Sequence, residues 1–166
     1  MKAFFVGFFG LALMTALVSC ATNPVTGKKS FIAIPESQEN SMGEAAYADV
    51  LRKEKISTDP RLNAIVTRVG QRIAAVANKP DYKWEFKVID SNVQNAFCLP
   101  GGKIAIYKGI LPVAKNEAGL ATVMAHEVVH ALARHGGQRM TQALGLQVLT
   151  AGLALTIFRP GAADTE

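Results

Sequence analysis

The strongest constraint on this chain is a pair of histidines four residues apart, His126 and His130, with Glu127 directly after the first. Residues four apart lie one turn apart on the same face of a helix, so both imidazoles can reach a single metal ion. Zinc prefers nitrogen ligands of this kind, at roughly 2.0–2.1 Å. The pattern therefore predicts a helix that carries a zinc site. The alternative is a pair of helix-face histidines satisfied by hydrogen bonds.

The residues around the motif predict the helix itself, over 117–135, with Asn116 as its N-cap and Gly136-Gly137 ending it. Glu127 would point beside the metal, where it can take a proton from a metal-activated water and pass it to the leaving amine. The metal would polarise the scissile carbonyl and lower the pKa of the water to about 7. These roles predict a metal-dependent enzyme that cuts peptide bonds.

Hydrophobic periodicity predicts further helices and short strands on both sides of the motif. We expect helices over 37–55, 60–77 and 141–158, and strands over 84–89, 96–99 and 103–107. Asp59 and Pro60 are the N-cap and first residue of the second helix. The 141–158 segment is short for a membrane span and is interrupted by glutamines, so we expect it to pack on the metal-binding helix.

The N-terminus predicts an export signal. Met1-Lys2 is followed by an apolar run and then by Leu17-Val18-Ser19-Cys20, which resembles the bacterial lipobox. We therefore expect a signal peptide over 1–19, a lipid on Cys20 and a tether over 20–35, rich in turn residues. Ala21 favours the outer membrane, facing the periplasm, by resemblance to enterobacterial lipoproteins. The alternative is an ordinary secretory signal with an incidental cysteine.

Composition excludes several other classes of protein. The chain has 166 residues, 49% of them hydrophobic, and two cysteines, too few for a disulfide framework or a zinc site of four cysteines. Its net charge of +5 is spread along the sequence rather than gathered into a basic stripe, so we expect no nucleic-acid partner.

Two segments together resemble peptidase family M48, the relatives of the heat-shock protease HtpX and the CAAX prenyl protease, and in particular their periplasmic lipoprotein branch. They are the stretch from Asn95 to Ile104, with its Asn-Ala-Phe and Pro-Gly-Gly, and the stretch from His126 to His135. The resemblance implies an α+β domain of zincin type over 36–158, with helices around a small, mainly antiparallel sheet and the motif helix beneath it. It also implies one Zn²⁺ per chain, with His126 and His130 as ligands and Glu127 as the catalytic base.

The same resemblance places a substrate-binding edge beside the cleft, where strand and turn can pair with substrate backbone by β-augmentation. The residues concerned are Asn95, Ala96, Phe97, Pro100, Gly101 and Gly102. The implied substrates are unfolded or misfolded envelope proteins, and the implied partners include the outer-membrane assembly machinery.

A catalytic zinc needs three protein ligands. The resemblance implies that the third is a Glu on a later helix, which we expect to lie beyond residue 166. His135 follows His130 by five residues, about 500° around a helix, so we expect it off the ligand face in a structural role. Asp164 and Glu166 lie on a predicted tail, 159–166. Three explanations stay open: a fragment of a longer product, a short protein that has lost activity, or a ligand from the tail or a partner chain.

Two further alternatives stay open. Cys98 could bind metal or react, although a small buried hydrophobic residue is the simpler interpretation. The rival to the enzyme is a catalytically impaired lipoprotein, a pseudopeptidase that binds unfolded clients or an assembly machine.

Overall fold

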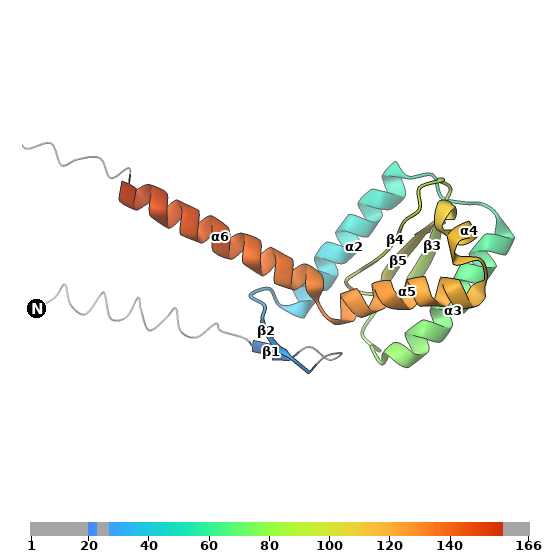
Figure 1. Cartoon of the computed structure of the whole chain (residues 1–166), viewed down its shortest axis with the longest axis horizontal. Helices are drawn as coiled ribbons and strands as arrows, with labels where there is room; N and C mark the ends of the chain where they lie inside the picture. The colour runs from blue at the N-terminus through green and yellow to red at the C-terminus, as the bar shows by residue number, and fades with distance from the viewer. Residues whose placement is uncertain (1–19, 23–26, 158–166) are drawn as a thin grey trace, which may run out of the picture.

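The computed structural model describes residues 20–22 and 27–157 (Figure 1). The predicted signal peptide, 1–19, and the predicted tail, 159–166, lie outside the described residues. The elements are β1 (Cys20–Thr22), β2 (Lys29–Phe31), α2 (Glu36–Lys53), α3 (Pro60–Ala77), β3 (Glu85–Ile89), β4 (Ala96–Leu99), β5 (Lys103–Tyr107), a 3₁₀ turn (Lys108–Ile110), α4 (Leu111–Ala114), α5 (Glu117–Leu132) and α6 (His135–Ile157).

The sheet beside the motif helix has the strand order β3-β5-β4, with β5 at its centre. Gly101 and Gly102 both have φ near +80° and form the tight turn that returns β5 antiparallel to β4, with Leu99 opposite Lys103. Since β4 carries the chain back across the sheet, β3 and β5 run parallel. The α+β zincin-like class is confirmed, and this sheet is mixed where we expected a mainly antiparallel one.

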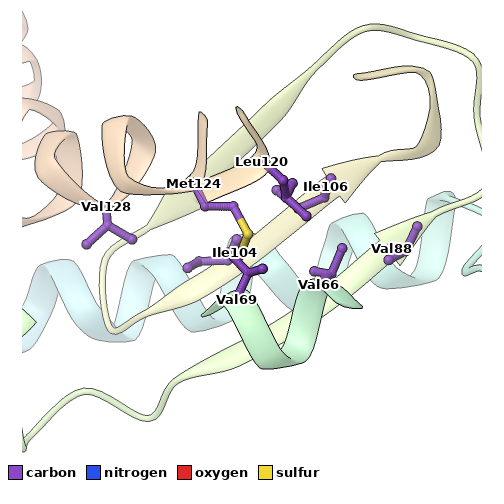
Figure 2. Packing of buried hydrophobic residues seen from close by; sticks show 8 residues of the cluster. All are labelled: Val66, Val69, Val88, Ile104, Ile106, Leu120, Met124 and Val128. Carbon is purple, nitrogen blue, oxygen red and sulfur yellow. The ribbon is translucent and has the colours of Figure 1, made fainter. Parts of the chain in front are cut away.

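The main core lies between α3 and α5 on one face of this sheet (Figure 2). Side chains from both helices and from two strands interdigitate there: Val66 and Val69 of α3, Val88 of β3, Ile104 and Ile106 of β5, and Leu120, Met124 and Val128 of α5. Alternation along β5 turns Ala105 to the opposite face, where Tyr47 of α2 covers it. The sheet is therefore covered by helices on both faces.

Replacing Met124 by alanine is expected to lower the free energy of unfolding by about 2–5 kcal/mol, because it leaves a cavity in a close-packed core. Met124 is 0% exposed, whereas Val76 on α3 is 82% exposed. The matched control Val76→Ala should change stability by no more than about 0.5 kcal/mol. Urea unfolding followed by circular dichroism measures both, and equal effects of the two variants would contradict this core.

The predicted start of α3 is confirmed. The Asp59 carboxylate accepts hydrogen bonds from the backbone N–H groups of Arg61 and Leu62, and Pro60 is the first helical residue. Asn78 then ends the helix in the left-handed conformation, with φ of 50°.

The predicted end of the motif helix is wrong. The α5 helix ends at Leu132, and Arg134 has a φ of +54°, which breaks the helix before α6 starts at His135. Gly136 and Gly137 lie in the first turn of α6 instead of ending a helix. The cause is a long-range contact: the Arg134 guanidinium binds Glu39 of α2 through Nε at 3.1 Å and Nη2 at 2.5 Å, and donates to the Ile34 carbonyl at 2.7 Å.

Gly137 allows this contact. A Cβ atom there would lie 2.0 Å from Oε1 of Glu39, so only glycine lets α6 begin so close to the buried carboxylate. The α6 helix then projects away from the rest of the molecule (Figure 1), and its residues 142–154 are exposed, so the expectation that this segment packs on the metal-binding helix is wrong. Among the described helices, α6 included, none combines the length and hydrophobicity that crossing a membrane requires.

We expected residues 20–35 to act as a tether, but the last residues of this segment contact the domain. β1 pairs antiparallel with β2, the Ala33 N–H donates to Thr141 Oγ1 of α6 at 3.0 Å, and Ile32 and Ile34 are buried. Residues 32–34 therefore pack as part of the folded body.

Candidate metal and catalytic site

The packing of α5 sets the direction of its motif residues. Asn116 caps the helix by accepting a hydrogen bond from the Gly119 N–H at 2.9 Å. Leu120, Met124 and Val128 follow at four-residue intervals and are buried against the sheet and α3. Because these three positions fix the rotation of the helix about its axis, His126 and His130 face away from the core.

The two predicted ligands converge. Nε2 of His126 and Nε2 of His130 lie 3.0 Å apart, with the rings edge to face. Two nitrogens bound tetrahedrally to one zinc at roughly 2.0–2.1 Å would lie about 3.4 Å apart, so the pair fits two positions of a zinc site with little movement. Within residues 20–22 and 27–157, no cluster of three or more His, Cys, Asp or Glu side chains could complete that site.

His135 does not lie where its spacing predicts. Its Nδ1 atom lies 2.7 Å from Nδ1 of His130, the ring nitrogen that does not contact His126. The 100°-per-residue argument fails because the helix breaks at Arg134. Hydrophobic periodicity could not have predicted this contact. It depends on the ion pair between Arg134 and Glu39, which lies 95 residues before Arg134 in the sequence.

Glu127 lies in a pocket of about 230 Å³ that also includes His130. The neighbouring walls come from β4 and its turn, through Cys98, Leu99 and Pro100, and from the start of α6, through His135 and Arg139. The motif acid therefore faces a cavity bounded by the strand that we expected to bind substrate. A larger open pocket, between α3 and β3, contains none of the motif residues.

The six predicted substrate-binding residues are only partly brought together. Ala96 and Phe97 lie on β4, an edge strand, after the exposed Asn95. Pro100 reaches the pocket beside Glu127. Gly101 and Gly102 are buried in the turn, and Gly102 lies against Trp84. Their role in substrate binding remains a prediction.

Cys98 is half-buried in the wall of the same pocket. Burial, and secondarily the negative charge of Glu127, raise the pKa of its thiol from 9.0 to about 12. The thiol therefore stays protonated at neutral pH, which agrees with its interpretation as a small hydrophobic residue.

Cys98 is expected to alkylate about a thousandfold more slowly in the folded chain than an unperturbed cysteine near neutral pH, because only the thiolate reacts. Because the folded state holds the thiol proton more tightly than the unfolded state, this difference contributes to the free energy of unfolding. The contribution is fully present below pH 9 and is lost as the pH rises through about 12. Peptide mapping after iodoacetamide treatment measures the rate at Cys98. The same chain in urea is the control, and equal rates in both states would contradict the raised pKa.

The fold and this geometry define a zincin-like domain, in which a helix with two converging histidines and an acid packs on a small sheet. The chain belongs to peptidase family M48, whose model matches residues 60–165. It is 37% identical over 139 residues to the mitochondrial metalloendopeptidase OMA1 of Schizosaccharomyces pombe, covering 81% of this chain and 41% of that protein. It is 29% identical over 122 residues to the beta-barrel assembly-enhancing protease of Escherichia coli, covering 74% of this chain and 25% of that protein.

A putative beta-barrel assembly-enhancing protease of Vibrio cholerae is 33% identical over 105 residues, covering 63% of this chain and 22% of that protein. The chain thus spans less than half the length of these curated relatives.

Proposed function

We propose that this chain carries the metal-binding part of a zinc-dependent metalloendopeptidase, with a peptidase domain over 36–158. His126 and His130 are two of the zinc ligands, and Glu127 is the general base. The observation that carries the proposal is the convergence of two Nε2 atoms to 3.0 Å beside a pocket that contains Glu127.

When bound, zinc polarises the scissile carbonyl and lowers the pKa of the attacking water to about 7. The Glu127 carboxylate accepts the proton of that water and then donates it to the leaving amine. Glu127 is half-buried and shares its pocket with the protonated thiol of Cys98 and with Leu99.

Substrate would bind as an extended strand along β4. This strand pairs with β5 on one side only, so the other edge can hydrogen-bond a peptide backbone. Asn95, Ala96 and Phe97 lie at one end of that edge, and the turn of Pro100, Gly101 and Gly102 lies at the other. We expect a preference for unfolded or misfolded proteins, because an unfolded chain offers long extended segments whose backbone is not already paired in a sheet.

We propose that the protein acts in the bacterial envelope, anchored by a lipid on Cys20 after removal of residues 1–19, at the outer membrane facing the periplasm. The lipobox-like sequence supports the anchor. The relatives from Vibrio cholerae and Escherichia coli, named for β-barrel assembly, support a role beside outer-membrane assembly, whereas the OMA1 relatives are mitochondrial.

The test uses the protein extracted from its own membrane, whose intact mass also reports its length and the lipid on Cys20. With zinc, it should cleave a reduced, unfolded protein. Chelation should stop cleavage, and added zinc should restore it. Tight zinc binding without cleavage would instead support a pseudopeptidase that binds clients.

A further inference from the structure

We infer that His135 is a positioning residue, whose hydrogen bond to Nδ1 of His130 holds that imidazole with Nε2 facing His126. The inference rests on the proposed function, because it assigns His135 a role toward the zinc site. It does not make His135 a ligand. His130 turns Nε2 to His126 and Nδ1 to His135, so each of its two ring nitrogens contacts a different histidine.

The contact with His135, together with the requirement of zinc for a free lone pair on Nε2, assigns the tautomer of His130. Two ring nitrogens 2.7 Å apart form a hydrogen bond in which one donates and the other accepts. A zinc ligand needs its lone pair on Nε2, so Nδ1 of His130 carries the hydrogen and Nδ1 of His135 accepts it. Metal-binding histidines generally donate their second N–H in this way, which fixes both the tautomer and the ring orientation.

His135 is itself held in place from a distant part of the chain. Glu39 is 1% exposed and binds Arg134, and the left-handed turn at Arg134 starts α6 with His135 against α5. The ring centroids of His130 and His135 are 4.9 Å apart and tilted by 53°. The acceptor is therefore positioned by the helix break and not by the helical repeat of the motif.

Zinc affinity, measured by competition with a chromophoric chelator, tests the inference. His135→Ala should weaken zinc binding by about 10–100-fold. His135→Asn, which keeps an acceptor, should restore most of it. Gly136→Ala is the matched control, since a Cβ there meets nothing within 4 Å. Unchanged affinity in His135→Ala would overturn the inference, as would a loss as complete as in His126→Ala, which would make His135 a ligand.

A second readout needs no metal. Nitrogen NMR of the zinc-free chain in mildly alkaline buffer should show His130 as one tautomer protonated at Nδ1, with coupling across the bond to His135. In His135→Ala the tautomers should mix, while circular dichroism confirms that the variant is folded. A tautomer unaffected by His135→Ala overturns the inference. If the wild type binds no zinc, the proposed function fails, and this NMR result alone decides the role of His135.

Discussion

Replacing Glu127 by glutamine is expected to lower kcat/KM for peptide cleavage by about 10²–10⁴-fold, the usual contribution of a positioned general base. Glutamine keeps the size and shape of the side chain but cannot accept the proton of the attacking water. Because Glu127 is not a proposed ligand, the zinc content of the variant should match that of the wild type. Cleavage of an unfolded substrate and metal analysis of the same samples measure the two quantities.

The matched control for this variant is Glu117→Gln, on the first turn of the same helix. Glu117 forms an ion pair with Arg68 in which both side chains are about half exposed. Its loss should cost at most about 1 kcal/mol of stability and leave cleavage unchanged. Equal processing by the wild type and by Glu127→Gln would refute the catalytic role of Glu127.

Replacing Arg134 by alanine is expected to lower the free energy of unfolding by about 3–5 kcal/mol, because it leaves the carboxylate of Glu39 buried without a partner. The side chains of Glu39 and Arg134 are only 2% and 15% exposed. Urea unfolding followed by circular dichroism measures the loss.

Two controls distinguish the cost of leaving a charge buried without a partner from the cost of losing an ion pair. Removing both charges together, in Glu39→Leu with Arg134→Leu, should recover most of the loss, since no unpaired charge remains. Breaking the exposed pair of Lys53 and Asp49, with side chains 72% and 41% exposed, should cost at most about 1 kcal/mol. If Arg134→Ala costs no more than Lys53→Ala, the buried pair does not stabilise the fold.

The parts of the fold that the sequence predicted are those with local causes. The bounds of β4 and β5 follow from the Pro-Gly-Gly turn between them, and the start of α3 follows from Asp59 and Pro60. The motif histidines converge because four-residue spacing on a helix requires it. In each case the signal lies within a few residues of the structure that it specifies.

The parts that the sequence did not predict depend on contacts between distant residues. The break at Arg134, and with it the place of His135, results from a partner on α2. The packing of Ile32 and Ile34 depends in the same way on α6 and Arg134. Gly136-Gly137 predicts a helix stop, but glycine also permits close approach, and Gly137 lies in the first turn of α6 against the buried carboxylate of Glu39.

The ion pair of Glu39 and Arg134 also affects where the boundary of an independently folding segment can be drawn. Glu39 lies before residue 60, where the match to the family model begins. A boundary drawn there would keep the whole motif helix and still separate Arg134 from its counter-ion. A shortened protein, or another scaffold that receives the motif, would therefore have to include α2.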